Sequence, residues 1–333
     1  MICETRQWVL NDHPRGRPIA DNDLKLVSAA LPPPASGEML LKTHYLGFDP
    51  AQKGWMENVA DYVAPMAIGD VMRGSAVTEV VESNGGRFEV GTMLAGSTGW
   101  AEHVIHNGEG LSRVARDLPP TAMLSILGTT GMTAWCGLFK IGRPVPSDVV
   151  LVSGAAGATG SIVGQLAKIA GCTAIGIAGG AEKCAWLTEE AGYDHAIDYK
   201  AGAIRDQIEA LAPDGVNVVF DNVGGRILND MLSQIANGAR VVICGGISRY
   251  ETGTLPTGPD NYFNLVFRRA RMEGFIVIDW ISEFPAIRQR MIELINQGRL
   301  TYREDVQTGF ENAPATLQRL FSGANRGKQL LKL

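Results

Sequence analysis

The chain has 333 residues, of which 45% are hydrophobic and 20% charged, and its formal net charge is −5 at pH 7. This composition excludes a disordered chain, and the acidic balance excludes the basic stripe of a nucleic-acid-binding protein. The length is too great for one ordinary core, so it predicts two domains.

The sequence shows no sign of export or of membrane insertion. Residues 1–10 lack the basic start and apolar run of a signal peptide, and no apolar stretch is long enough to cross a bilayer. The five cysteines are odd in number and widely spaced, at Cys3, Cys136, Cys172, Cys184 and Cys244. We therefore expect free thiols, a cytoplasmic protein, and neither a membrane nor a nucleic acid as partner.

The first part of the chain, to about residue 120, predicts a mostly β domain. Short β-rich segments at Glu38–Tyr45, Ala76–Glu82 and Trp100–Ile105 are separated by Gly and Pro turns. A buried, small-residue helix pair is expected over Thr121–Phe139.

Strands and helices alternate after residue 120, which predicts βαβ units and a parallel sheet. The expected strands are Asp148–Ser153, Thr173–Ala178, Asn217–Asp221, Arg240–Cys244 and Phe275–Ile278. The expected helices are Ala158–Ala170, Ala181–Ala191, Ile204–Leu211, Ile227–Ala236 and Pro285–Gln297.

The tail leaves this alternation, with a strand expected at Thr301–Thr308, a helix at Asn312–Phe321 and a strand at Gln329–Leu333. We interpret it as returning to the first domain. The predicted domains are therefore residues 1–122 with 300–333, and residues 123–299.

A glycine-rich turn joins the first of these strands to its helix. Val149–Ser153 runs into Gly154-Ala155-Ala156-Gly157-Ala158-Thr159-Gly160. Small residues allow the backbone N–H groups to approach a pyrophosphate, and a helix N-terminus favours an anion. Such a turn alone is a weak signal, but the strand, turn, helix and second strand in register favour dinucleotide binding.

The second strand predicts which dinucleotide is bound. NAD enzymes usually end this strand with a carboxylate, whereas here it ends in Gly179-Gly180, and Lys183 follows. The missing acid leaves room for a 2′-phosphate and the lysine can pair with it, so we predict NADPH. Tyr199, after a third strand that lies between Thr173–Ala178 and Asn217–Asp221, could close the same pocket with its hydroxyl. The alternatives are a solvated lysine at Lys183 and a surface tyrosine at Tyr199.

Metal ligands are not clustered in the sequence. His103 and His106 lie in a strand-like stretch where they would face opposite sides, and there is no Cys-x-x-Cys. We therefore predict no metal. Without a Lewis acid, reduction of a C=C bond conjugated to a carbonyl is favoured over reduction of an isolated carbonyl, because hydrogen bonds suffice to stabilise an enolate oxygen.

Several segments together resemble the medium-chain dehydrogenase/reductase superfamily, and within it the zinc-free prostaglandin reductase and alkenal double-bond reductase branch. The segments are Gly69–Gly74, Ala155–Gly160, Phe220–Gly225, Cys244–Tyr250 and Asn325–Lys328. The resemblance implies a Rossmann-type doubly wound parallel sheet inserted in a mostly β GroES-like catalytic domain. It also implies a cytoplasmic homodimer, and zinc-dependent members carry a histidine where this chain has Met72.

The resemblance also assigns roles to residues of this chain. Gly157, Ala158, Thr159 and Gly160 would hold the pyrophosphate, and Lys183 with Tyr199 the 2′-phosphate. Asn222 would lie over the cofactor. The nicotinamide half would be lined by Cys244, Gly245, Gly246, Ile247, Ser248, Tyr250, Phe275, Ile276 and Val277, with Asn325 reaching in from the tail.

Tyr250 is the candidate catalytic residue, for enolate stabilisation or proton donation, and the alternative is a loop tyrosine that gates the cleft. Ala51 follows Asp49-Pro50 where many relatives have a tyrosine, which predicts an altered substrate pocket. Aromatic residues that could line this pocket are Phe48, Trp55, Tyr62, Tyr262 and Trp280, although core positions are the alternative. The segment Ser248–Tyr262 is a candidate lid or a plain loop.

These features predict an NADPH-dependent reductase of α,β-unsaturated aldehydes and ketones. Two alternatives stay open: an NADPH quinone oxidoreductase on the same scaffold, and a nucleotide-binding protein used as a redox sensor or structural protein.

Overall fold

The computed structural model describes residues 3–250 and 258–333, and the chain divides into two compact units. Unit 1 comprises Met1–Ser125 and Glu304–Leu333, and unit 2 comprises Ile126–Arg303. The domain boundaries expected from the sequence, after residue 122 and before residue 300, lie within a few residues of these divisions.

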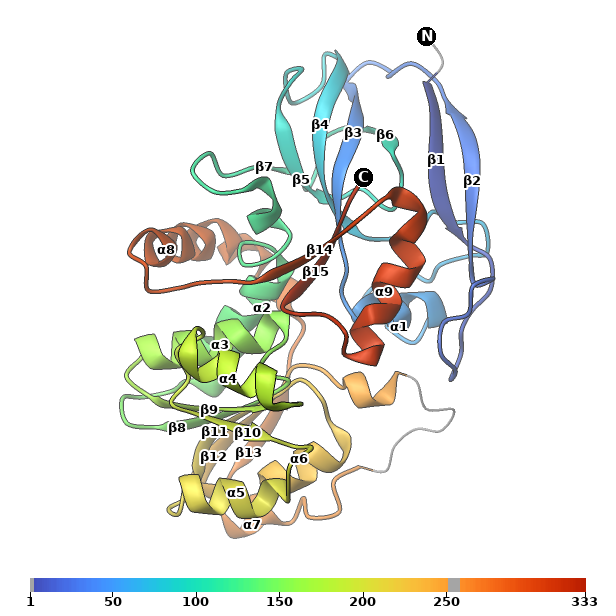
Figure 1. Cartoon of the computed structure of the whole chain (residues 1–333). Helices are drawn as coiled ribbons and strands as arrows, with labels where there is room; N and C mark the ends of the chain where they lie inside the picture. The colour runs from blue at the N-terminus through green and yellow to red at the C-terminus, as the bar shows by residue number, and fades with distance from the viewer. Residues whose placement is uncertain (1–2, 251–257) are drawn as a thin grey trace. The chain divides into compact units, whose positions relative to one another are not determined.

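Unit 1 is mostly β (Figure 1). A hairpin of β1 (Cys3–Leu10) and β2 (Leu24–Leu31) accompanies a larger sheet of order β14-β15-β3-β4-β5-β7, with β6 paired to β3. The strands of the larger sheet are β3 (Glu38–Gly47), β4 (Ser75–Asn84), β5 (Met93–Ser97), β6 (His103–His106), β7 (Ser112–Arg113), β14 (Glu304–Thr308) and β15 (Lys328–Lys332). The helical segments of unit 1 are α1 (Ala51–Glu57), η1 (Pro120–Met123), η5 (Phe310–Asn312) and α9 (Ala313–Ser322).

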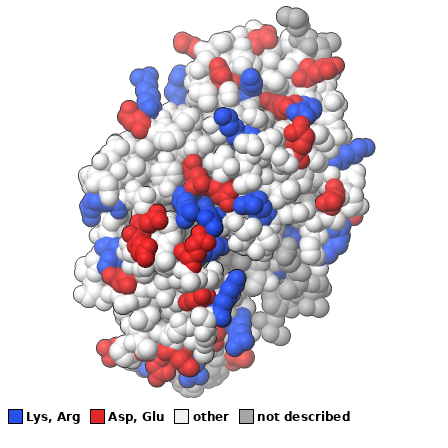
Figure 2. Space-filling model, in the orientation of Figure 1, with Lys and Arg blue, Asp and Glu red and all other residues white. Residues whose placement is uncertain are grey.

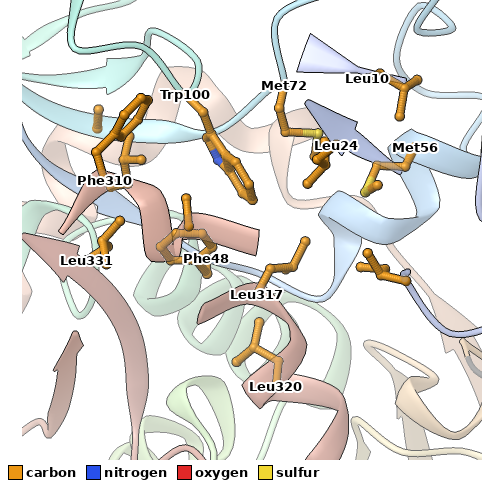
Figure 3. Packing of buried hydrophobic residues seen from close by; sticks show 14 of the residues in the cluster. Leu10, Leu24, Phe48, Met56, Met72, Trp100, Phe310, Leu317, Leu320 and Leu331 are labelled. Atoms are coloured by element: carbon orange, nitrogen blue, oxygen red, sulfur yellow. The ribbon is translucent and has the colours of Figure 1, made fainter. Parts of the chain in front are cut away.

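The two ends of the chain meet in that larger sheet. Strand β15 lies between β14 and β3, and Leu331 pairs with Leu46 in antiparallel register. Side chains from both ends also share one core, in which Phe48 packs edge-on against Trp100 with ring centroids 5.0 Å apart. Figure 3 shows Phe310, Leu317 and Leu331 from the tail among these residues.

Unit 2 contains a six-stranded sheet of order β10-β9-β8-β11-β12-β13 in which all pairs are parallel. Its strands are β8 (Val149–Ser153), β9 (Thr173–Ala178), β10 (His195–Asp198), β11 (Val216–Asp221), β12 (Ile235–Ile243) and β13 (Arg271–Gly274). The central strands are apolar and buried, as expected for a sheet covered on both faces.

Helices cover both faces of this sheet. Figure 1 shows α3 and α4 on one face and α5 and α6 on the other. The helical segments of unit 2 are α2 (Thr129–Cys136), the π-helical η2 (Gly137–Gly142), α3 (Ala158–Ile169), α4 (Ala181–Glu189), α5 (Ile204–Leu211), α6 (Gly225–Leu232), η3 (Ile247–Arg249), α7 (Asn264–Phe267), η4 (Val277–Glu283) and α8 (Phe284–Asn296). The predicted fold class, a Rossmann-type sheet inserted in a mostly β domain, is confirmed.

The strand predicted at Phe275–Ile278 is wrong. The strand in this region is β13 (Arg271–Gly274), and residues from Val277 onward form η4. An edge strand pairs on one side only, so it tolerates charged residues such as Arg271, and no apolar run marks it. The apolar run begins beyond the strand, where the Phe275 ring lies near Gly137.

The helix predicted at Ile227–Ala236 extends too far. Helix α6 ends at Leu232, and Ile235 already begins β12. Ile235 and Ala236 are buried and continue the apolar pattern of the helix, which hid the boundary. The register of β12 against β11 then shifts around Gly238, whose φ is +72°.

Within residues 3–250 and 258–333, no helix is both long and apolar enough to cross a membrane. Acidic and basic side chains are interspersed over the face drawn in Figure 2.

Candidate functional site

The glycine-rich turn forms the sharp connection between β8 and α3. Gly154 has a φ of +59°, and the Gly157 N–H donates to the Gly154 carbonyl at 2.9 Å. Gly157 caps α3 in an extended conformation without a side-chain hydrogen bond to the helix. The first turn, from Ala158 to Gly160, therefore offers N–H groups that have no acceptor inside the helix, as a bound phosphate requires.

Close packing explains the glycines and supports the fit to a dinucleotide. A Cβ on Gly160 would overlap the carbonyl oxygen of Gly154. From the other side, the buried Tyr193 donates its hydroxyl to the Gly160 carbonyl at 2.6 Å. The turn is thus fixed from two directions, in a shape that lets its backbone N–H groups approach a pyrophosphate.

The 2′-phosphate candidates follow two neighbouring strands. Lys183 is half-buried in the first turn of α4, which begins after β9. Tyr199 follows β10, is 44% exposed, and lies against Gly179 at the end of β9. Because β9 and β10 are parallel neighbours, their carboxyl ends share one edge of the sheet.

Sequence reasoning missed a carboxylate at this edge. Asp198 Oδ1 accepts the N–H groups of Gly180 and Lys200, each at 2.9 Å. These backbone hydrogen bonds lower the pKa of Asp198. Asp198 ends β10, which was not among the strands whose bounds were predicted, and it directly precedes Tyr199, which is the signal that could have found it.

The loops after β11 and β12 are joined to one another. The Ile247 N–H donates to the Asn222 carbonyl at 3.3 Å. Ser248 donates from both its N–H (3.1 Å) and its hydroxyl (2.6 Å) to the Val223 carbonyl. Gly224 and Gly225 both have positive φ, and a Cβ on either would lie close to Ser248 Oγ. Tyr250 ends this segment, half-buried at the C-terminus of η3.

Cys244 begins the loop after β12, and its thiol is expected to be unreactive. Burial, with a smaller effect from the charge of Asp221, raises the pKa of its thiol to about 12. Its N–H donates to the Asp221 carbonyl at 2.9 Å, so its backbone extends the contact between the two loops. The thiol is therefore neutral at physiological pH and suits an apolar lining role.

Phe275, Ile276 and Val277 follow β13 at the same edge of the sheet. Ile276 is 36% exposed, whereas Val277 is buried. The Phe275 ring packs against Trp280, with centroids 5.9 Å apart, and so is held in place from within unit 2.

The structure therefore gathers most predicted site residues at one edge of one parallel sheet. They follow β8, β9, β10, β11, β12 and β13 at their carboxyl ends. Asn325 belongs instead to unit 1, where its side-chain amide donates to the Gly327 carbonyl at 2.8 Å. Its role toward the cofactor stays a prediction.

The aromatic candidates separate into different environments. Phe48 is fully buried in the core of unit 1, so it occupies a core position, the alternative to a place in the substrate pocket. Trp55 donates its indole N–H to the Tyr62 hydroxyl at 3.1 Å, and Tyr62 is 38% exposed. Ala51 opens α1, the helix that also carries Trp55. Tyr262 is exposed in unit 2.

The candidate lid at Ser248–Tyr262 falls partly outside the described residues, because positions 251–257, with Gly253 and Pro256, are not among them. Among the residues that are described, no three His, Cys, Asp or Glu side chains gather where a metal ion could be held. Met72 is fully buried in the core of unit 1, where Figure 3 shows it beside Leu24.

Comparison with known proteins agrees with this architecture. Residues 6–114 match the family model described as the N-terminal domain of oxidoreductase, and residues 158–296 match the one described as zinc-binding dehydrogenase. The chain is 39% identical to prostaglandin reductase 1 of Oryctolagus cuniculus, over 98% of this chain and 93% of the relative. It is 36% identical to the NADP(+)-dependent 2-alkenal reductase of Nicotiana tabacum, over 98% and 96%.

A solved structure shares the whole fold. The crystal structure of CurA in complex with NADPH from Vibrio vulnificus superposes with a TM-score of 0.92 at 38% identity, covering 98% of each chain. A dinucleotide turn in a doubly wound sheet that is inserted in a mostly β domain defines a two-domain dehydrogenase or reductase. The chain belongs to the medium-chain dehydrogenase/reductase superfamily, in the zinc-free branch of the prostaglandin and alkenal reductases.

Proposed function

We propose that this NADPH-dependent oxidoreductase reduces the C=C bond of α,β-unsaturated aldehydes and ketones. The observation that carries the proposal is the combination at one sheet edge of a glycine turn with Lys183, next to glycines at residues 179 and 180. The Asp198 carboxylate at this edge accepts the N–H groups of Gly180 and Lys200. Support for the substrate class comes from relatives that are named for prostaglandin and 2-alkenal reduction.

The residues of unit 2 fit the cofactor in three groups. The turn from Gly157 to Gly160 would hold the pyrophosphate, and Lys183 with Tyr199 the 2′-phosphate. Asn222 and the segment Cys244–Tyr250 would line the nicotinamide half. Bound there, NADPH supplies the hydride that the β-carbon of the substrate receives.

Tyr250 is the residue we assign to the substrate carbonyl. As the C=C bond is reduced, negative charge develops on the carbonyl oxygen, and a phenolic O–H can donate a hydrogen bond or a proton to it. The tyrosine follows Ile247–Arg249, a segment attached by hydrogen bonds to the loop after β11, so its position is coupled to the cofactor loops.

The test is a steady-state assay of NADPH consumption with 2-alkenals, enones, isolated ketones and quinones. We expect turnover of the conjugated enals and enones, with the saturated carbonyl compound as product, and little turnover of isolated ketones. Reduction of quinones alone would identify a quinone reductase instead. Tight binding of NADPH with no turnover of any compound would contradict the proposal and favour the sensor alternative.

A further inference from the structure

A buried carboxylate at the end of β11 is not part of any role assigned so far. Asp221 is 1% exposed, yet its two oxygens accept four hydrogen bonds. Oδ1 accepts the Ser153 hydroxyl at 2.6 Å and the N–H groups of Val223 and Gly224 at 3.1 Å, and Oδ2 accepts Gly224 N–H at 2.9 Å. Every one of these donors is an uncharged hydroxyl or backbone N–H group.

The Ser153 hydroxyl is both a hydrogen-bond donor and a hydrogen-bond acceptor. Its Oγ accepts the backbone N–H of Asn222 at 2.8 Å while it donates to Asp221. The Asn222 side chain returns the contact by donating from Nδ2 to the Ser153 carbonyl at 2.7 Å. The end of β8, one residue before the glycine turn, is thereby tied to the end of β11 at the side chains as well as at the backbone.

We propose that Asp221 and Ser153 are positioning residues that set the nicotinamide half of the NADPH site. The inference rests on the proposed cofactor role and adds two residues to it. The Ser153–Asp221 pair fixes the backbone from Asn222 to Gly224. That backbone in turn holds Ile247 and Ser248 through the Asn222 and Val223 carbonyls.

A positioning role explains why a buried carboxylate is retained. Burial raises the pKa of Asp221, while its hydrogen bonds with Ser153, Gly224 and Val223 oppose that rise. A neutral side chain would avoid the cost of burying charge, but a carboxylate offers acceptors at both ends, Oδ1 to Ser153, Val223 and Gly224 and Oδ2 to Gly224. An amide in the same place would turn an N–H group toward at least one of these donors.

The contacts also predict which part of the cofactor depends on the pair. The loops they fix are those assigned to Asn222 and to Cys244–Tyr250, at the nicotinamide half. Lys183 and Tyr199 follow β9 and β10, which lie on the other side of β8 from β11 and β12 in the sheet. Binding of the adenosine end should therefore be insensitive to the pair.

The test measures equilibrium binding by calorimetry of two probes, NADPH and adenosine 2′,5′-bisphosphate, which carries the 2′-phosphate but no nicotinamide. We expect Asp221→Asn to raise the Kd for NADPH about tenfold to a hundredfold, the effect of losing a hydrogen-bonded charge, and to leave the Kd for the bisphosphate within about twofold. Ser153→Ala keeps the carboxylate and should give the same selectivity with a smaller change.

Three controls separate the possible outcomes. Asp214→Asn, the same change at an exposed turn, should leave both Kd values unaltered. Lys183→Ala should weaken both probes. Equal weakening of both probes by Asp221→Asn and Ser153→Ala, or no weakening of either, would overturn the positioning role. Failure of the unaltered protein to bind NADPH would instead overturn the proposed function. If Asp221→Asn does not fold, Ser153→Ala alone decides.

Discussion

The hydroxyl oxygen of Tyr199 lies 2.6 Å from the position that a Cβ on Gly179 would occupy. The end of β9, where NAD enzymes usually carry an acid, is therefore filled by the ring of a residue that follows β10. A single methyl group at this position must displace the tyrosine. Because Tyr199 is 44% exposed, its ring can move without disturbing the core.

We predict that Gly179→Ala weakens NADPH binding severalfold while the melting temperature changes little. The added methyl group shifts the Tyr199 hydroxyl away from the expected 2′-phosphate position. Calorimetry on the single variants and on the double variant forms a double-mutant cycle. In the Tyr199→Ala background the Gly179 change should have no further effect on the Kd. An equal loss in both backgrounds would show that the two residues act independently.

Lys183→Ala should lower the affinity for NADPH and shrink its preference over NADH. The reason is the loss of an ammonium group from the expected 2′-phosphate position, a point charge that NADH does not need. Kd values for both cofactors measure the effect, and Lys25→Ala on an exposed position of β2 serves as the matched control. An unaltered ratio of the two Kd values would make Lys183 a solvated lysine.

Tyr250→Phe should lower kcat clearly while the Kd for NADPH stays nearly constant. Removal of the hydroxyl deletes a donor that acts on the developing enolate, which affects the transition state more than the ground state. Tyr45→Phe, at a half-buried position of β3 with no assigned role in the site, is the control. If kcat is unchanged, Tyr250 has no chemical role and the gating interpretation takes its place.

How accurately the sequence predicts the helices and strands of this protein depends on their hydrophobic periodicity and burial. The bounds of β9 and α5 were predicted to the residue, because buried strands and amphipathic helices have strong local patterns. The hairpin of β1 and β2 was missed, and β13 was displaced, because strands with mixed polar and apolar residues lack such a pattern.

The candidate site was predicted where motifs mark a backbone shape, as in the turn from Gly154 to Gly160. It was not predicted where a role depends on contacts between distant residues. Nothing in the local sequence indicates that Asp221 accepts the hydroxyl of Ser153, or that Tyr193 reaches Gly160. The first contact arises from the parallel order of the strands, which places the ends of β8 and β11 at one edge, and the second from the packing of the Tyr193 side chain against α3.

A buried ion pair in unit 1 gives a prediction on stability. Lys53 in α1 is fully buried, and its Nζ lies 2.6 Å from Oε1 of Glu57, which also accepts the Gly16 N–H at 3.1 Å. Lys53→Met leaves the Glu57 carboxylate buried without its cation, so we expect a loss of about 3–5 kcal/mol in the free energy of unfolding. Urea denaturation measures this loss.

The control for that measurement is the exposed pair of Arg290 and Glu293. Arg290→Met should cost less than about 1 kcal/mol, because solvent screens an exposed pair. The double change of Lys53→Met with Glu57→Leu should restore much of the lost stability. A loss for Lys53→Met no larger than that of Arg290→Met would mean that water reaches the pair.

Four of the five cysteine thiols, those of Cys136, Cys172, Cys184 and Cys244, should resist alkylation at neutral pH. Burial raises the pKa of Cys136 to about 11 and that of Cys244 to about 12, and it also raises the pKa of Cys172 and Cys184. A raised thiol pKa keeps the unreactive protonated form, so labelling of these four residues by iodoacetamide at pH 7.5 should be far slower than that of a free cysteine peptide. Mass spectrometry locates the label. Rapid labelling of Cys244 would revive the redox-sensor alternative.

The place of β15 in the sheet has a consequence for biosynthesis. One edge of β3 pairs with β15 at Tyr45–Gly47, yet the two strands are separated by the whole of unit 2. On the ribosome, all segments of unit 2 are synthesised before residues 328–332. The inserted domain can therefore complete its sheet first, while the surrounding domain waits for the last strand to arrive.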